Sequence, residues 1–479
     1  MSTPEVNELS YNFQKLRWVK RIITLAAGTI IWHLPVPWDI TPDAWQLFTI
    51  FITAIIGVLL EAFSIFTASV IALIAVVLLR VLTPEQAYSG FSESFILLIL
   101  AAFLVAKGVM KSGLGRRIAF LLIRRFGRST LNLGYCLVVT DTILGPSIPS
   151  NTARSGIMYP ITHALSLDTG SLPTAEGRKR TGTYLMMTYI AGQTISSALW
   201  LTGMAGNPIG VGIAAQFGVN MNFGNWVFVA SVPCIVALIA IPFVLYKLFP
   251  PESKYTPEAP EMARKGLQEM GPMSTQEWIM GITFMGMILL WAFSSLLNIN
   301  LAIVAFLGLT ILILANVYTI GDIRDGAGDA LETYVWFAIL YMISTQLNDM
   351  GFMKILGAQI ATYFSDYNWV TVYILLTILY IVIHYLFVSQ TAHLLALYAV
   401  FLQVAVNAEV PVALMAFMLS FATNLFAAIT PQASSSNILF VGSGFLPSRD
   451  IYKQGAVITV LNTVIFLLAT PWILWASSL

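Results

Sequence analysis

The sequence predicts an all-α polytopic membrane protein, with about 11 transmembrane helices and two re-entrant hairpins arranged as two inverted-topology repeats. Three observations predict this fold. The 479-residue chain is 58% hydrophobic and only 10% charged, whereas soluble domains carry about 25% charged residues. Many apolar runs are long enough to cross a bilayer as helices, which takes about 20 residues. One short polar motif also occurs at matching places in both halves of the chain.

Two apolar stretches, 130–165 and 368–402, each carry one copy of the motif, and we expect them to form the re-entrant hairpins. Pro146 and Pro149 interrupt the first stretch. Irregular backbone at membrane depth survives only where protein or a water-filled cavity satisfies it. The predicted transmembrane helices lie near residues 18–36, 44–60, 66–82, 93–111, 184–215, 225–248, 277–296, 298–319, 334–350, 412–443 and 453–476.

The distribution of Lys and Arg predicts the orientation in the membrane. Cytoplasmic loops carry an excess of these residues, and most of the 24 fall on the cytoplasmic side if the N-terminus is cytoplasmic. Only Arg80 and Lys354 then lie outside. In this topology the first hairpin opens to the cytoplasm and the second to the exterior, so the repeats are inverted. We expect a multi-pass protein of the cytoplasmic membrane without a signal peptide.

Residues 113–128 form a basic segment just before the first hairpin. Its Arg side chains project within about half of a helical wheel, and apolar side chains lie opposite. We expect either a helix in the cytoplasmic interface, acting as an arm between a fixed and a moving part, or a plain stop-transfer charge cluster. Residues 249–275, rich in Pro, Glu, Lys and Met, predict a hydrophilic linker between the halves.

The polar motif is Ser-Asn-Thr-Ala-Arg at residues 150–154, and Ser-Gln-Thr-Ala-His at residues 389–393 repeats its pattern half a chain later. The correspondence continues upstream, where residues 109–113 align with 347–351. Each motif is followed by an apolar run with a break, and the ends of broken helices attract anions. Such matched interruptions are typical of the binding site of a secondary transporter. The breaks lie at 202–210 and 430–437.

Arg154 is the most informative residue of the motif. A charged side chain near the bilayer centre costs about 2.5–3.5 kcal/mol on insertion scales, so it is normally paired or functional. Its partner is either Asp141 across the hairpin or the carboxylate of a bound substrate, which a guanidinium binds with two hydrogen bonds. We favour the substrate. A lone buried His is more often a packed residue, but the repeat favours His393 as a second contact.

The candidate substrate-binding residues combine the two motifs with the two breaks. We expect no cofactor, metal or catalytic residue, because Cys136 and Cys234 lie in apolar runs that are typical of packing. An anion channel is one other open class. A membrane hydrolase, suggested by residues 442–444, would need a paired nucleophile and base. The candidates are Ser150, Asn151, Thr152, Arg154, Gly206, Asn207, Ser389, Gln390, Thr391, His393, Thr430 and Pro431.

The paired motifs 150–152 and 389–391, half a chain apart, resemble those of the divalent anion/sodium symporter family, also called solute carrier 13 or INDY-type carriers. Na⁺-coupled members usually carry Ser-Asn-Thr in both halves without basic neighbours. Gln390, Arg154 and His393 depart from that pattern. They resemble instead the branch of 2-oxoglutarate/malate translocators and citrate/succinate or tartrate/succinate antiporters.

The resemblance implies an elevator mechanism in a homodimer. Scaffold parts would comprise residues 1–128 and 276–366, each including its arm helix. Transport parts would comprise residues 129–248 and 367–479, and the cytoplasmic linker 249–275 would join the repeats. The partners would be dicarboxylate substrates and the lipid bilayer, with no nucleic acid.

We therefore expect an exchanger of dicarboxylates such as succinate, malate, fumarate or 2-oxoglutarate. A dicarboxylate carries about two negative charges, and desolvating each ion costs several kcal/mol. Fixed charge on Arg154, and on His393 if protonated, would offset these charges without bound Na⁺. The empty carrier would then cross the membrane poorly, which predicts obligatory exchange. The alternative is a Na⁺-coupled di- or tricarboxylate symporter.

Overall fold

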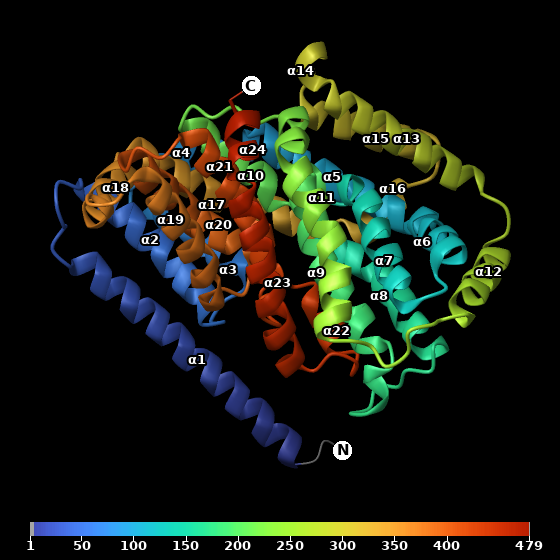
Figure 1. Ribbon diagram of the computed structural model, residues 1–479. Helices are drawn as coiled ribbons and strands as arrows, with labels where there is room; N and C mark the ends of the chain where they lie inside the picture. Colours follow the sequence, from blue (N-terminus) through green and yellow to red (C-terminus); the bar gives the residue numbers. More distant parts are fainter. Residues whose placement is uncertain (1–3, 479) are drawn as a thin grey trace.

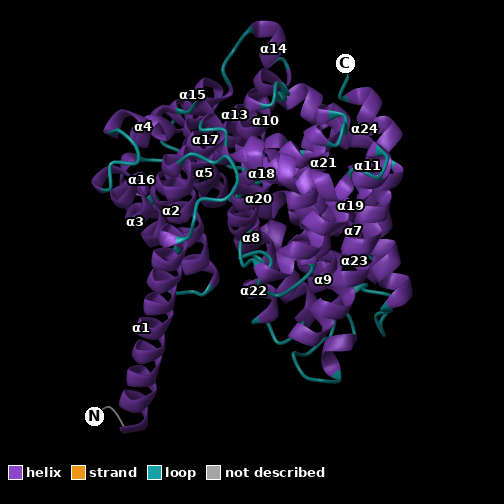
Figure 2. Ribbon diagram, turned by 90° about the vertical axis from the view of Figure 1, so that its left-hand side faces the viewer, coloured by secondary structure: helices purple, strands orange, loops and turns teal. Residues whose placement is uncertain are grey.

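The computed structural model describes residues 4–478, with side chains from residue 17 onward. Over this range the chain consists of helices and short 3-10 turns, and its β-type pairing is limited to an isolated bridge between Ser129 and Tyr255. The all-α prediction is confirmed. One long helix, α1 (Pro4–His33), projects from a body in which the other helices pack together (Figure 1, Figure 2).

The two halves of the chain contain helices of similar order. The first half holds α2 (Pro42–Leu59), α3 (Ile65–Leu78), α4 (Pro84–Tyr88), α5 (Ser94–Ser112), α6 (Leu114–Phe126), α7 (Thr130–Leu144), α8 (Asn151–Asp168), α9 (Gly182–Leu199), α10 (Gly206–Gln216) and α11 (Phe223–Leu248). The second half holds α12 (Glu258–Met270), α13 (Thr275–Ala292), α14 (Ser294–Leu297), α15 (Leu301–Leu314), α16 (Ile320–Gly326), α17 (Gly328–Asp349), α18 (Phe352–Ala361), α19 (Trp369–Ile383), α20 (Gln390–Asn407), α21 (Val412–Leu425), α22 (Asn437–Val441), α23 (Ser448–Leu468) and α24 (Thr470–Ala476).

Within the described residues, 6 helices are long and apolar enough to cross a membrane, and shorter apolar helices lie at α3, α15 and α21. The sequence predicted eleven spans, among them the runs 184–215 and 412–443, whereas two of the six helices, Trp369–Leu386 and α20, lie in the stretch predicted as the second hairpin. Each of those two runs is divided between two helices. The predicted breaks are confirmed, since α9 ends at Leu199 before α10, and α21 ends at Leu425 before α22. The number of spans and their inversion stay predictions.

The predicted arm segment 113–128 forms helix α6, and a similar short helix, α18, occupies the matching place in the second half. A glycine in the left-handed backbone region precedes each of them, namely Gly113 with φ 79° and Gly351 with φ 77°. A Cβ atom makes this conformation costly, which explains glycine at both positions. The chain therefore turns sharply from α5 into α6, and likewise from α17 into α18.

One arginine on the predicted basic side of α6 is buried in the protein. Arg117 is buried, its Nη2 lies 3.0 Å from Glu277 Oε2, and its Nη1 donates to the Gly271 carbonyl oxygen at 3.0 Å. This buried pair fastens α6 to the start of α13. Part of the predicted hydrophilic linker 249–275 is itself ordered as α12, which packs against α6.

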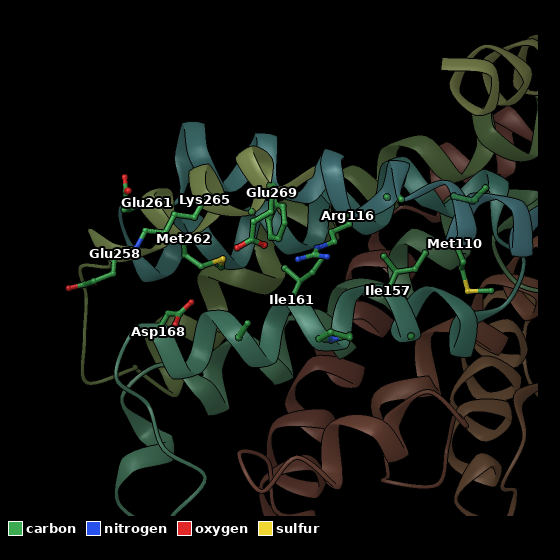
Figure 3. Close-up of a pocket in the computed structure, with 18 residues that line it drawn as sticks. Met110, Arg116, Ile157, Ile161, Asp168, Glu258, Glu261, Met262, Lys265 and Glu269 are labelled. Atoms are coloured by element: carbon green, nitrogen blue, oxygen red, sulfur yellow. The ribbon is translucent and has the colours of Figure 1, made fainter. Parts of the chain in front are cut away.

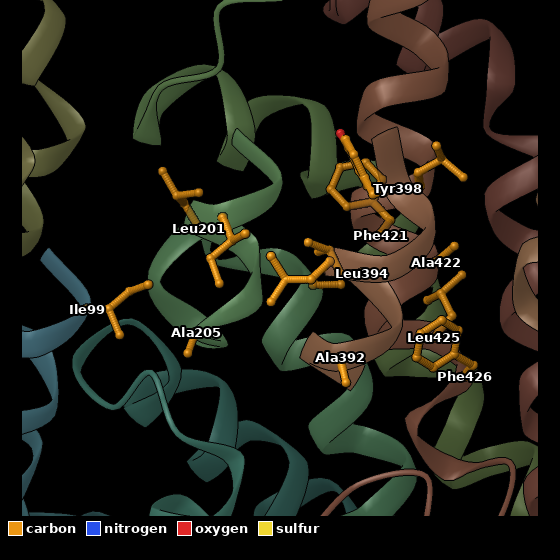
Figure 4. Close-up of a cluster of buried hydrophobic side chains, with 14 of the residues drawn as sticks. Ile99, Leu201, Ala205, Ala392, Leu394, Tyr398, Phe421, Ala422, Leu425 and Phe426 are labelled. Carbon is orange, nitrogen blue, oxygen red and sulfur yellow. The ribbon is translucent and has the colours of Figure 1, made fainter. Parts of the chain in front are cut away.

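Buried apolar side chains support the helix that follows the second motif. Figure 4 shows Leu394 of α20 among Leu201 at the first break and Phe421 of α21. All three side chains are fully or almost fully buried. Because burial of each such side chain contributes about 1.5–3 kcal/mol, this cluster holds α20 against both broken helices.

At Gly455, helix α23 packs directly against the backbone that leads into the second break. A Cβ placed on Gly455 would lie 1.9 Å from the Ala428 carbonyl oxygen, so backbone would have to move. We expect Gly455→Ala to destabilise the protein by about 1–3 kcal/mol, seen as a lower unfolding temperature in detergent. Gly286→Ala in α13 is the matched control, because a Cβ there meets nothing within 4 Å. Equal unfolding temperatures for both variants would contradict this close approach.

Candidate functional site

The two polar motifs lie at the start of two helices whose N-terminal ends meet. Ser150 caps α8, with its Oγ accepting from the Ala153 amide at 3.2 Å, and Ser389 caps α20 in the same way at 3.3 Å. Asn151 Nδ2 then donates to Gln390 Oε1 at 3.1 Å, across 239 positions of sequence. The repeated motif therefore marks a real contact between the halves.

A cavity of about 680 Å³ opens at this meeting point. One wall consists of the two motifs, the loop before α10 and the loop before α22. The opposite wall comes from α5 and α17. The residues of the first wall include Ser150, Asn151, Thr152, Met204, Ala205, Ser389, Gln390, Thr391, Ser434 and Ser435, and those of the second include Phe103, Lys107, Met110, Asp329, Glu332, Thr333 and Trp336.

The wall formed by the motifs is electrically neutral but suited to anions. It presents hydroxyl and carboxamide donors from both motifs, and Thr152 Oγ1 lies 2.7 Å from Ser435 Oγ. Helices α8 and α20 begin at this wall, and α10 begins just beyond Ala205. A helix N-terminus carries roughly +0.5 elementary charge, together with unpaired N–H groups. Several such ends around one cavity suit it to a carboxylate-bearing ligand.

The expectation that a substrate carboxylate pairs with Arg154 is corrected by the structure. Arg154 is completely buried, and its Nη1 lies 2.9 Å from Asp141 Oδ2, which is equally buried. Tyr189 also donates to Asp141, at 2.9 Å. Arg154 does not line the cavity. Its charge is compensated inside the protein, because a buried guanidinium is stable only with a counter-ion and acceptors close by.

The remaining acceptors of Arg154 show what it does instead. Its Nη2 donates to Asn151 Oδ1 at 2.8 Å and to the Gly203 carbonyl oxygen at 3.0 Å, and its Nη1 donates to Ser196 Oγ at 2.9 Å. The guanidinium thus fills a cluster of oxygen atoms between the first motif and the break after α9. Arg154 positions Asn151, which in turn contacts the cavity.

His393 is likewise buried behind its motif and does not line the cavity. Its Nδ1 lies 3.3 Å from His384 Nδ1, and the rings of Tyr380, Phe387 and Phe426 surround it. This apolar setting corrects the expectation of a second cationic contact, because burial among aromatic rings disfavours the protonated imidazole. The second motif is thus supported by aromatic packing around His393, whereas the first is supported by the ion pair of Arg154.

Buried carboxamide side chains stabilise the two breaks, and one of them, Asn207, is a candidate residue. Asn207 Nδ2 donates to the Ser197 and Trp200 carbonyl oxygens at 2.9 and 3.0 Å, and Asn424 Nδ2 donates to Asn207 Oδ1 at 2.8 Å. Asn437 Nδ2 donates to the Thr430 carbonyl oxygen at 3.1 Å in the second break. These amides satisfy carbonyl groups that the broken helices leave unpaired. Four candidates therefore lie at or behind the breaks and outside the cavity lining, namely Gly206, Asn207, Thr430 and Pro431.

Two lysines of α5 pair with aspartates of the second half, and one of these pairs, Lys107 with Asp329, lines the cavity. Lys107 Nζ lies 3.2 Å from Asp329 Oδ2, and one turn further along α5, Lys111 Nζ lies 2.6 Å from Asp322 Oδ2. The hydrogen bond from Lys111, followed by those from Thr319, lowers the pKa of Asp322 to about 2. The Lys111 pair therefore persists until the pH falls through about 2. Lys107 was not among the residues that the sequence assigned to the site.

A larger cavity, of about 1000 Å³, lies between α6, α8 and α12 (Figure 3). Two basic side chains and four carboxylates line it, so it is poorly suited to a dianion. We take the smaller cavity as the candidate site. No group of three or more His, Cys, Asp or Glu that could hold a metal occurs in the described part of the chain. The charged residues of the larger cavity are Arg116, Asp168, Glu258, Glu261, Lys265 and Glu269.

Comparison with known sequences gives a consistent result. The family described as "Sodium:sulfate symporter transmembrane region" matches residues 15–478. "Putative malate transporter YflS" of Bacillus subtilis (strain 168) is 38% identical, covering 94% of this chain and 95% of that protein. "Dicarboxylate transporter 2, chloroplastic" of Spinacia oleracea is 36% identical, covering 93% and 80%. "L-tartrate/succinate antiporter" of Shigella flexneri is 32% identical, covering 96% and 98%.

Solved structures agree on the fold. MtrF of Neisseria gonorrhoeae superposes with a TM-score of 0.55 at 13% identity, covering 97% of this chain and 94% of that one. The YdaH transporter of Alcanivorax borkumensis gives a TM-score of 0.53 at 14% identity, covering 84% and 88%. At such low identity the likeness concerns the fold alone, which is that of an all-helical membrane transporter.

The ion pair behind the first motif gives a direct test of the role of Arg154. Asp141→Asn leaves the guanidinium buried without a counter-ion, which costs about 3–5 kcal/mol, so we expect a much lower unfolding temperature in detergent. Asp141→Asn combined with Arg154→Met removes both charges and is expected to recover most of the lost stability. A single variant as stable as the wild type would show that Asp141 is not the necessary partner of Arg154.

Proposed function

This chain belongs to the divalent anion/sodium symporter family, and we propose that it is a secondary transporter that exchanges C4 and C5 dicarboxylates without Na⁺. The observation that carries the proposal is the cavity in which the N-terminal ends of α8 and α20 meet. A linear dicarboxylate has two anionic ends, and two facing helix N-termini offer each end its own donors. The names of the relatives support dicarboxylates as the substrate class.

Independence from Na⁺ is supported by the atoms around Arg154. Na⁺ is a hard cation that favours oxygen ligands, as Ca²⁺ and Mg²⁺ do. At the junction of the first motif and the break, the oxygens of Asn151 and Gly203 already accept from the guanidinium. The guanidinium of Arg154 thus occupies a position whose oxygen atoms could otherwise bind Na⁺. In this proposal Arg154 takes the place of a coupled Na⁺ and does not compensate the substrate directly.

The proposed mode of transport is exchange. It requires that the empty carrier crosses the membrane poorly, so that uptake of one dicarboxylate is coupled to exit of another. The name of the antiporter relative supports this mode. The proposed substrates are succinate, malate, fumarate and 2-oxoglutarate, and the alternative is a Na⁺-coupled di- or tricarboxylate symporter.

The proposal includes the elevator movement and the homodimer that the family resemblance implies. In it, residues 129–248 and 367–479 move against a scaffold built from 1–128 and 276–366. The left-handed Gly113 and Gly351 support the assignment of α6 and α18 as arm helices at the ends of the scaffold parts, because each glycine lies where a long helix turns into a short one. The N-terminus is proposed to be cytoplasmic, in a cytoplasmic membrane.

Purified protein in proteoliposomes tests exchange and Na⁺ dependence together. We expect radiolabelled succinate uptake in Na⁺-free buffer when unlabelled dicarboxylate is trapped inside, and little uptake into empty liposomes. The matched control repeats both conditions with an inward Na⁺ gradient, which should change neither result. Uptake into empty liposomes driven by that gradient would establish the symporter instead.

Gln390→Glu tests whether an anion binds beside the two helix N-termini. The substitution keeps the side-chain shape and adds a negative charge to the cavity wall. Unit charges about 4 Å apart repel by about 4 kcal/mol at an effective dielectric constant of 20, so kcat/KM for succinate should fall a hundredfold or more. Gln403→Glu, on the same helix but outside the cavity lining, is the control and should transport normally. Equal activity of the two variants would place the substrate elsewhere.

A further inference from the structure

Lys107 is the sole cationic side chain among the described residues that line the cavity between the motifs and the α5/α17 wall. Its ammonium group is held by Asp329, at 3.2 Å. The Lys107 side chain is 28% exposed and that of Asp329 is 77% exposed, so the pair faces the cavity rather than the protein interior. A pair this exposed is weak, because water competes for both partners.

The charges around the cavity make this lysine important for an anionic substrate. The motif wall is neutral, and the charge of Arg154 is compensated behind it by Asp141. The α5/α17 wall contributes Lys107 together with Asp329 and Glu332, so its formal charge is negative. A dianion entering here meets net repulsion unless it engages the ammonium group directly.

We propose that Lys107 determines substrate affinity at this face, by exchanging its partner Asp329 for one carboxylate of the bound dicarboxylate. The other carboxylate then lies at the N-terminal ends of α8 and α20. This inference rests on the proposed function. The exchange of partners needs little energy, because one exposed carboxylate replaces another at the same ammonium group.

The position of Lys107 restricts its effect on substrate affinity to one face of the membrane. Lys107 lies near the C-terminal end of α5, and Asp329 lies near the N-terminal end of α17, on the same end of that helix pair. These helices belong to the proposed scaffold, whereas the motifs belong to the proposed moving part. When the motifs travel to the opposite face, the substrate leaves Lys107 behind. Lys107 therefore strengthens substrate binding at the membrane face to which the cavity opens in this structure. The distribution of Lys and Arg in the loops assigns that face to the cytoplasm.

Lys111 supplies a matched control. It lies one turn further along α5 and pairs with Asp322, but it does not line the cavity. Removing its charge breaks an ion pair between the same two parts of the chain, without removing a cation from the cavity. If the ion pairs of α5 had a purely structural role, substitution of Lys107 and of Lys111 would change the KM in the same way.

The test compares Lys107→Met, Lys107→Arg, Asp329→Asn and Lys111→Met by succinate exchange, in intact cells for the external face and in inside-out vesicles for the cytoplasmic face. A hydrogen bond to a charged group is worth enough to change affinity about tenfold. We expect Lys107→Met to raise the KM at the cytoplasmic face about tenfold and to leave the external KM within about twofold. Lys107→Arg should stay close to the wild type, and Lys111→Met should have no effect on either KM.

Asp329→Asn keeps the inference falsifiable if Lys107→Met folds poorly. It frees Lys107 and removes a negative charge, so the KM at the cytoplasmic face should fall severalfold. An unchanged or higher KM for Asp329→Asn, an equal change at both faces for Lys107→Met, or a matching effect of Lys111→Met would overturn the inference. Absence of dicarboxylate exchange by the wild type is a separate result that would overturn the proposed function itself.

Discussion

The buried ion pair between Arg154 and Asp141 is the interaction on which the geometry of the cavity depends. One guanidinium joins α7 through Asp141, the first motif through Asn151, and the break after α9 through Gly203. Because both charges are fully buried, neither is tolerable without the other. Asn151, fixed in this way, donates to Gln390 and so sets the register between the two motifs. The alignment of the halves therefore rests on a charge pair that no ligand needs to touch.

The second half reaches the same backbone arrangement by different chemistry. His393 takes the place of Arg154, but its partners are His384 and a shell of aromatic rings. Packing of this kind needs no counter-ion, whereas the charged version does. As a result both motifs present only neutral groups to the cavity. Attraction of an anion on this wall then comes from helix N-termini, each worth roughly half an elementary charge.

The sequence could predict which polar groups meet, but not which of their neighbours face the cavity. The repeat of residues 150–152 at 389–391 was enough to predict that the two motifs belong to one site, and Gly and Pro residues predicted the breaks. The preferred partner of Arg154, a substrate carboxylate, was wrong, because spacing along the chain does not reveal whether a side chain points forward to a ligand or back into the protein. Lys107 was not assigned to the site for a related reason, since its partner Asp329 is 222 positions away.

The placement of charge in this transporter follows from the cost of moving it. Several kcal/mol are needed to desolvate each unpaired ion, so a part that crosses the membrane is best built with its charges paired internally. The motifs, with Arg154 matched to Asp141 and neutral donors in front, meet that requirement. The charged side chains that line the cavity, Lys107, Asp329 and Glu332, lie instead on α5 and α17. If those helices stay in place while the motifs move, as in the proposed elevator, the charged wall acts on the substrate at one face and imposes no desolvation cost on the movement itself.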